Sequence, residues 1–353
     1  MQHNWVKLLI SFAIILHLMP IHSWAAEEYG NEEATADEPI GDLIIHHITD
    51  SHYWEFWHGA TIYLPVILYS EAEGLKIFPT SRPFFDDHLH SVPYQGYLVD
   101  HGKIHHVDGE ASVYDFSITK NVAQIFLSVI LLVFVFASVA KRYKNPNQAP
   151  KGIQAFFEPI IVFIKEDIAI PNIGPNKYKR FMPYLLTLFF FIWFNNILGL
   201  MPGAANVTGN IAVTGVLALL TFIITQFNGN RHYWNHVFNT PGVPWWLKYG
   251  IPIMPIVEFI GLFTKPFSLM IRLFANITAG HIIILSLFSL IFIFESVFIS
   301  PVSVAFSIFM NFLELFVALL QAYIFTLLSA MYFGGAVEEG HHDEEKETDQ
   351  ALI

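Results

Sequence analysis

The chain has no cysteine and few charged residues, and each shortage restricts what the protein can be. Without cysteine it has no disulfide and no thiolate metal site. Charged residues make up 14% of its 353 residues, whereas soluble domains carry about 25%. The charges gather at 26–120, 141–180 and 338–349 and leave long apolar stretches between them. This distribution is typical of a protein with several membrane-spanning helices.

Basic residues are scarcer than acidic ones, with 18 Lys and Arg against 30 Asp and Glu and a formal net charge of −12. An acidic chain lacks the basic face that phosphate contacts require, so nucleic acid is excluded as a partner. We expect no bound cofactor and no metal site.

The chain divides into four regions by composition. A positive charge at Lys7, an apolar run over 8–18 and small residues after it predict a signal peptide over residues 1–25. A retained membrane anchor is the alternative, although the apolar run is short for a span. Residues 26–118 are polar, aromatic and rich in histidine, and they predict an extracytoplasmic segment whose fold the sequence leaves open. A membrane domain over 119–336 and an acidic cytoplasmic tail over 337–353 follow.

Apolar stretches long enough to cross a bilayer give the fold class, an all-α polytopic membrane protein with about five membrane helices. A helix of 20 residues reaches about 30 Å, one hydrocarbon thickness. The last two stretches exceed that length, which predicts a long tilted hairpin. Residues 152–170, interrupted by Pro159, are too short and too charged to span and predict an interfacial helix. The predicted spans are 121–140, 181–201, about 208–227, 251–294 and 302–333.

Basic residues predict the orientation. Eight of the 18 Lys and Arg residues lie between 141 and 180, and such loops face the cytoplasm. The mature N-terminus is then outside, and five crossings place the C-terminus in the cytoplasm.

Arg272 is the most informative residue, because it lies inside an apolar stretch and cannot lose its proton. A charge at the centre of a bilayer costs about 2.5–3.5 kcal/mol even on lenient scales, so such residues mark functional sites. A static ion pair within the chain is the alternative. Between 250 and 334 the other ionisable side chains of the Asp, Glu, Lys and His types are Glu258, Lys265, His281, Glu295 and Glu314.

An antiparallel hairpin places two pairs of these polar residues level with each other. Two residues that face each other across such a hairpin have residue numbers with a nearly constant sum. The sum is 593 for Arg272 with Gln321 and 595 for His281 with Glu314. The sums predict a turn near 296–298. Asn276 follows Arg272 at i+4 and shares its face, whereas His281 at i+9 points to the opposite side. Arg272 therefore needs a partner other than the second helix if His281 faces that helix.

The segment KPFSLMIRLFANITAGH, with ELFVALLQAYIFTLL behind it and NNILGLMPG and TGNIAVT before it, resembles subunit a of F-type ATP synthases over about residues 120–335. The resemblance implies a proton-translocating stator with two half-channels that couples ion flow to rotation and ATP synthesis. It assigns Arg272, Gln321 and Asn276 to the rotor-facing centre. It assigns His281 and Glu314 to the outer half-channel, and Glu258 and Ser268 to the inner one.

The same resemblance implies the partners and the location. A ring of c subunits, peripheral-stalk b subunits, the F1 sector through the complex, and membrane lipid are the expected partners, in a bacterial inner membrane. The choice between proton and sodium depends on the carboxyl site of the c subunit. The signal-like start, the histidine-rich segment and the acidic tail depart from minimal members of the family.

Two other classes of function stay open at this point. Histidines at 46, 47, 52, 58, 88 and 90 suggest a membrane-bound metalloenzyme. An independent secondary transporter is the other class, but such transporters usually have paired internal repeats, which are not evident here.

Overall fold

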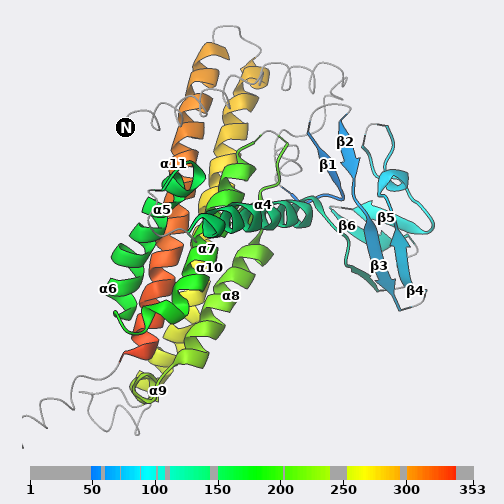
Figure 1. Cartoon of the computed structure of the whole chain (residues 1–353). Coiled ribbons are helices and arrows are strands. Elements are labelled where there is room, and N and C mark those ends of the chain that lie inside the picture. Colours follow the sequence, from blue (N-terminus) through cyan, green and yellow to red (C-terminus); the bar gives the residue numbers. More distant parts are fainter. Residues whose placement is uncertain are drawn as a thin grey trace, which may run out of the picture. The chain divides into compact units, whose positions relative to one another are not determined.

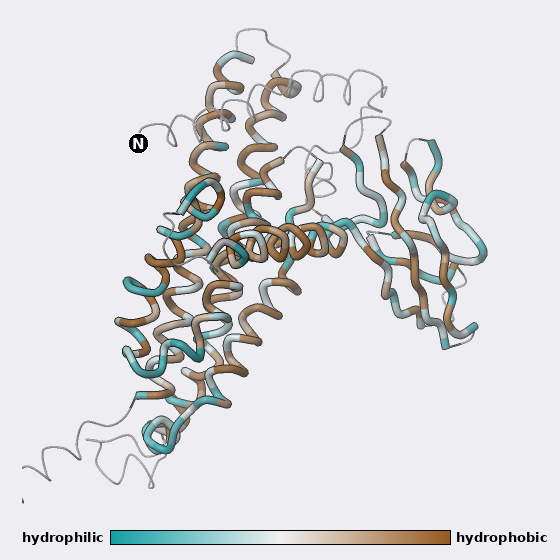
Figure 2. The backbone as a smooth tube through the Cα atoms, viewed as in Figure 1, coloured by the Kyte–Doolittle hydropathy of each residue, from teal (hydrophilic) through white to brown (hydrophobic). Residues whose placement is uncertain are grey.

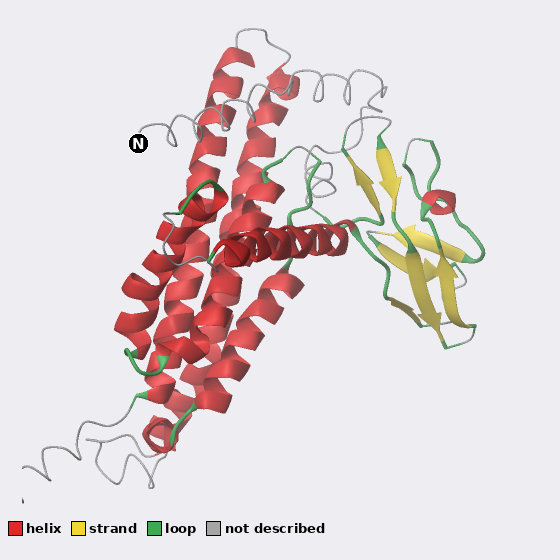
Figure 3. Ribbon diagram, in the orientation of Figure 1, coloured by secondary structure: helices red, strands yellow, loops and turns green. Residues whose placement is uncertain are grey.

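The computed structural model describes residues 49–338 except 57–59, 72, 88, 101, 108–111, 144–149, 202, 239–252 and 295–299. The predicted signal peptide, the predicted turn near 296–298 and all of the tail beyond residue 338 lie outside the described residues. Figure 1 labels the helices and strands, and Figure 3 separates the helical part from the strands.

Among the described residues five helices are long and apolar enough to cross a membrane, which confirms the predicted fold class. Their outer surfaces carry exposed large apolar side chains such as Phe134, Phe263 and Phe316. Figure 2, which colours the backbone by hydropathy, shows that hydrophobic residues predominate along these helices. A helix that is apolar on its exposed faces is typical of a membrane span. The five helices are α4 (Lys120–Arg142), α7 (Tyr178–Gly199), α8 (Ile211–Asn228), α10 (Ile253–Phe294) and α11 (Ser300–Val337).

Helices α10 and α11 are longer than a bilayer requires, as predicted. They have 42 and 38 residues, which correspond to roughly 60 Å of helix each. Pro301 lies in the first turn of α11, where its missing N–H would have had no helical partner anyway. The tilt that this length implies stays a prediction.

The segment between α4 and α7 is one almost continuous helical rod, because Pro159 does not interrupt it. Helix α5 (Ile153–Phe163) contains this proline, a π-helical turn follows over Ile164–Ala169, and α6 (Ile170–Ile173) completes the rod. Pro159 is the seventh residue of α5, so its missing N–H removes one hydrogen bond inside the helix, and the more loosely wound π-helical turn begins five residues later. The predicted interfacial position of the rod stays untested.

The region before α4 contains short antiparallel strands, which the sequence had not resolved. The strands form a three-stranded sheet of order β4-β3-β7 and two two-stranded pairs, β1-β2 and β5-β6. Their core contains Val66, Leu68, Phe84 and Tyr97, each 0% exposed. The strands are β1 (Tyr53–Glu55), β2 (Thr61–Tyr63), β3 (Val66–Ser70), β4 (Gly74–Phe78), β5 (Tyr97–Asp100), β6 (Lys103–His106) and β7 (Val113–Asp115).

The chain divides into two compact units. The first contains Met1–Ile130, Phe194–Asn210 and Asn276–Ala318. The second contains Leu131–Trp193, Ile211–Ala275 and Leu319–Ile353. Helices α10 and α11 each contribute to both units, so each unit is described below by itself.

Aromatic packing holds the second unit together. Phe157 of α5 packs on Phe190 of α7 with ring centroids 5.5 Å apart, and Phe181 of α7 stacks on Phe333 of α11 at 4.8 Å. Near the end of α11, Gly334 lies directly against the backbone carbonyl of Asn172. A side chain at Gly334 would have no room there, so this glycine permits the close approach of the two helices.

Candidate ion-translocation site

A buried polar network joins the helices of the first unit. Asn196 in α7 donates to the Ala318 carbonyl of α11 at 3.3 Å and accepts from Thr208 at 2.5 Å. Gln124 of α4 makes two hydrogen bonds with the backbone of Ala205, at 2.7 and 2.6 Å. Hydrogen bonds between membrane helices fix their packing. The motif residues around NNILGLMPG therefore position the helices that carry the outer pair of predicted site residues.

That outer pair consists of His281 on α10 and Glu314 on α11. The His281 Nε2 atom lies 3.5 Å from Glu314 Oε1, and the Glu314 side chain is 3% exposed. The level pairing expected from the residue numbers is present. A second contact, from the Ser303 hydroxyl to the Leu287 carbonyl, continues the antiparallel run of the two helices.

Gly280 leaves the space that the Glu314 carboxyl occupies. A Cβ atom added at Gly280 would lie 2.8 Å from Glu314 Oε1 and 2.9 Å from its Cδ. The carboxyl thus lies against the backbone of α10, beside His281. Neither carboxyl oxygen has a hydrogen-bond partner among the described residues, and neither does the buried hydroxyl of Ser307 two turns earlier on α11. Buried polar atoms without a protein partner are usually hydrogen-bonded to water.

Arg272 and Gln321, two of the residues predicted to face the rotor, belong to the second unit. Asn276, the third, is the first residue of α10 that belongs to the first unit. Gln321 on α11 is buried at 3% exposure, whereas Arg272 on α10 is half-buried. Among the described residues Arg272 forms no ion pair with a carboxylate, and no hydrogen bond joins it to Gln321. Asn276 is exposed. The level pairing of Arg272 with Gln321 stays a prediction.

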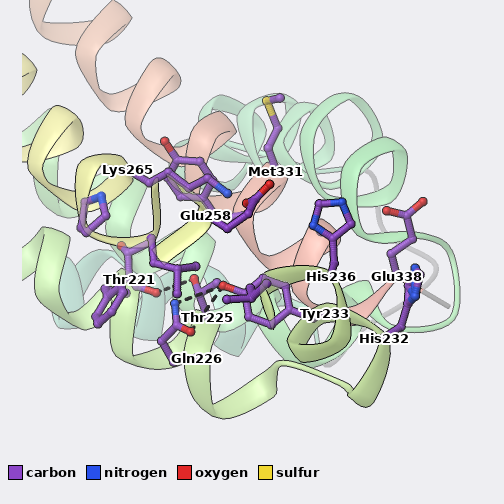
Figure 4. A pocket seen from close by; sticks show the side chains of 16 residues that line it. Thr221, Thr225, Gln226, His232, Tyr233, His236, Glu258, Lys265, Met331 and Glu338 are labelled. Atoms are coloured by element: carbon purple, nitrogen blue, oxygen red, sulfur yellow. Dashed lines mark hydrogen bonds between the residues drawn. The ribbon is translucent and has the colours of Figure 1, made fainter. Parts of the chain in front are cut away.

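A cavity of about 270 Å³ opens in the second unit (Figure 4). Glu258, which the sequence assigned to the inner half-channel, lines it. Ser268, assigned to the same half-channel, is exposed and does not. Lys265 also lines the cavity, with its ammonium 5.7 Å from the centre of the Tyr332 ring. The polar lining residues are Thr221, Thr225, Gln226, His232, Tyr233, His236, Glu258, Lys265, Tyr332 and Glu338.

Sequence reasoning missed the contribution of α9 (Arg231–Phe238) to this cavity. His232 and His236 both line it and are separated by four residues, the spacing that places two side chains on one helix face. The same spacing in RHYWNHVF could have indicated a polar face.

The histidines that suggested a metal site have other surroundings where the structure describes them. His52 is buried, and its Nε2 atom lies 2.9 Å from Asp115 Oδ2. His90 lies beside Asp86, at 3.3 Å. Over the described parts of the chain no group of three His, Asp or Glu side chains is arranged to hold a metal. His46, His47, His58 and His88 lie outside those parts.

Comparisons with known proteins agree over most of the chain. A family model described as ATP synthase A chain matches residues 122–334. A second model, a domain of unknown function (DUF8433), matches residues 43–131 and so covers the strand-containing region.

Curated relatives extend the match towards the N-terminus. ATP synthase subunit a 2 of Chlorobaculum tepidum is 42% identical over 332 residues, which cover 91% of this chain and 81% of the relative. ATP synthase subunit a of Chloroherpeton thalassium is 46% identical over 251 residues, 69% of this chain and 74% of the relative. The corresponding protein of an Anaeromyxobacter strain is 41% identical over 328 residues, 88% of this chain and 74% of its own length.

Proposed function

This chain belongs to the ATP synthase A chain family, and from that membership we propose how its own residues move protons through the membrane sector of an ATP synthase. The protein is the proton-translocating stator subunit of that sector and a membrane protein with five apolar helices. The roles of individual residues, the partners and the orientation are the proposal that follows.

Arg272 carries the proposal. It lies within the long apolar helix α10 and has no carboxylate partner among the described residues of its own chain. A permanent charge in a low-dielectric setting is costly unless an opposite charge compensates it. A carboxylate that arrives on a moving neighbour would supply that compensation. We assign this neighbour as the ring of c subunits, each with one carboxyl.

The electrostatic consequence is release of a proton from the ring. A positive charge within about 4–6 Å favours the ionised form of a carboxyl and lowers its pKa. A ring carboxyl that reaches Arg272 would then lose its proton to the inner half-channel. The same fixed charge repels a proton that would otherwise pass directly between the half-channels, so flow stays coupled to rotation. Gln321 and Asn276 are the proposed polar neighbours that orient the two charged groups.

His281 and Glu314 form the proposed outer half-channel relay. The imidazole and the carboxyl lie 3.5 Å apart, slightly beyond the roughly 2.6–3.2 Å of a direct proton transfer, and contacts of this kind tighten when the site is at work. A proton received here would neutralise a ring carboxylate, which can then turn into lipid without the cost of burying a charge.

The cavity beside Glu258 is the proposed start of the inner half-channel. It is lined by carboxyl, imidazole, ammonium and hydroxyl groups, so water and protons can enter it. Ser268, exposed on the same helix, would meet this path at the surface that the ring covers. The basic residues between 141 and 180 support an inner side in the cytoplasm, with the mature N-terminus outside. The b subunits and the F1 sector are the other proposed partners.

The test is ATP-driven proton pumping by the complete ATP synthase with Arg272→Ala in this chain. We expect pumping to be abolished while the complex still assembles. The matched control is Arg82→Ala, because Arg82 is already paired with Asp87 in its own chain and should not be needed. Pumping by the Arg272→Ala complex at the rate of the Arg82→Ala complex would refute the assigned role.

A further inference from the structure

Helix α9 presents two different faces. His232, Tyr233, His236 and Val237 line the cavity of the second unit, whereas Trp234, Asn235 and Phe238 do not; His232 and His236 are also exposed, so they border both the cavity and the surroundings. Figure 4 shows His232, Tyr233 and His236 around the same space as Glu258. The polar side chains of this short helix are therefore placed at the cavity, although its other face is open to the surroundings.

The position of α9 is fixed by Asn230, the residue before its first turn. The Asn230 side-chain oxygen accepts from the Tyr233 N–H at 2.8 Å, a helix N-cap. Its backbone N–H donates to the Ala336 carbonyl at 2.9 Å, and its amide nitrogen donates to the Glu338 carbonyl at 2.6 Å. One residue thus caps α9 and ties it to the end of α11, which keeps both histidines against the cavity.

Polar groups of four elements face this cavity, and those of three elements are titratable. Helix α9 contributes His232, Tyr233 and His236, α10 contributes Glu258 and Lys265, and the end of α11 contributes Tyr332 and Glu338, while α8 adds Gln226 and two threonines. Burial raises the pKa of Tyr233, a hydrogen bond with Gln226 lowers it in part, and the negative charge of Glu258 raises it again. Tyr233 therefore stays a neutral hydroxyl at neutral pH, and its oxygen lies 3.2 Å from the Gln226 amide nitrogen.

We propose that His232 and His236 are proton-exchange residues at the mouth of the inner half-channel, and that α9 holds them there. The inference rests on the proposed function of this cavity. Histidine is the side chain that gains and loses a proton between about pH 5 and 8. A proton that leaves the cavity binds the unprotonated ring nitrogen of a neutral imidazole and forms imidazolium. The imidazolium then loses one N–H proton to bulk water or buffer, which restores the neutral ring. In ATP-driven pumping the same two transfers run in reverse.

Two features distinguish this role from that of an ordinary solvated helix. Both histidines line the cavity that Glu258 also lines, and Asn230, which caps α9 and is bonded to the end of α11, holds the helix in place. Among the described residues no metal-binding group of three is present, so proton exchange is the chemistry that these side chains support best.

The experiment uses inverted membrane vesicles that contain the complete ATP synthase, in which the cytoplasmic face meets the medium. The variant is His232→Gln with His236→Gln. At low buffer concentration we expect the initial rate of ATP-driven proton pumping to fall by roughly tenfold. This is less than the roughly 100-fold for loss of a positioned acid–base group, because water still exchanges protons at this exposed site. A high concentration of imidazole should return the rate towards wild type, because a mobile buffer then carries the protons.

Asn235→Ala is the control, because Asn235 lies on the same helix, is exposed and does not line the cavity. Its pumping should match wild type in both buffers. A double-histidine variant that pumps like Asn235→Ala at low buffer overturns the inference, and so does a slow rate that imidazole does not raise. If the double variant fails to assemble, His236→Gln alone is measured with the same two outcomes.

The two proposals fail separately. If Arg272→Ala abolishes pumping and the histidine variant pumps normally at low buffer, the function stands and only the role of α9 is lost. If Arg272→Ala pumps normally, the proposed function itself is wrong.

Discussion

Replacing Gly280 by alanine adds one Cβ atom beside Glu314 and so tests the proposed relay of His281 and Glu314 in the outer half-channel. The added Cβ would lie 2.8 Å from Glu314 Oε1, and ordinary contact begins at 3.4 Å, so the carboxyl must retreat by at least 0.6 Å. His281 and Glu314 are 3.5 Å apart, so a retreat of this size disturbs the transfer distance. A displacement of about 1 Å can cost about 100-fold in rate, and we therefore expect pumping to fall by roughly tenfold.

The stability of the Gly280→Ala protein should rise although its pumping rate falls. Alanine in a helix interior is more favourable than glycine by about 0.5–1 kcal/mol, and the Glu314 side chain can move without shifting the backbone. The variant should therefore assemble in normal amounts. A loss of transport with normal assembly separates an effect on the relay from an effect on folding.

Gly261→Ala is the matched control, because it lies on the same helix and has no atom within 4 Å of an added Cβ. Both variants are measured in inverted vesicles by ATP-driven proton pumping and by passive proton flow after the F1 sector is removed. Equal rates for Gly280→Ala and Gly261→Ala would refute the reasoning.

Three further predictions concern packing, charge and pH. Gly334→Ala should sharply reduce the amount of assembled protein because its Cβ would collide with the Asn172 carbonyl, whereas Gly335→Ala, with nothing within 4 Å, should assemble normally; immunoblots of membranes check this. Glu314→Gln keeps the shape of the side chain but cannot exchange a proton, so we expect a loss of pumping of roughly 100-fold, and a near-normal rate would contradict the relay. Burial by itself would raise the pKa of Asp115, but hydrogen bonds from His52 and Ser117 overcome this and lower it. Its contribution to stability is therefore present above the ordinary carboxyl pKa of about 4 and lost as pH falls through the lower folded-state pKa. Limited proteolysis of the strand-containing region across that acidic range should show growing susceptibility, and Asp115→Asn should remove this pH dependence.

Most of the membrane domain could be predicted from the sequence because its signal is strong and local. Uninterrupted apolar stretches locate each span, and the ends of α4 and α10 fall within two residues of the expected limits. The pairing of His281 with Glu314 could also be predicted, because antiparallel helices of equal rise bring residues together at a constant sum of residue numbers. Register in a hairpin follows from geometry alone.

The strand-containing region could not be read in the same way. Its strands have only three to five residues, and their burial depends on partners that are distant in sequence, such as β3 with β7. Local signals were nevertheless present. The pattern in VILYS alternates between buried and less buried residues, and Gly102, at φ +74°, lies in the short turn between β5 and β6.

The cavity beside α9 escaped prediction for a different reason. It is formed by side chains of α8, α9, α10 and α11, which are more than 100 residues apart at the extremes. The sequence indicates a polar face on a short helix, but only packing determines what that face meets.

The account depends most directly on what the Arg272 guanidinium faces in the assembled enzyme. A structure of the complete ATP synthase in a membrane measures this. The account predicts the guanidinium within about 4–6 Å of a carboxyl carried by the rotor ring, the range in which one charge governs the ionisation of another. A guanidinium held in an ion pair with an acid of its own chain, beyond the reach of the ring, would contradict it.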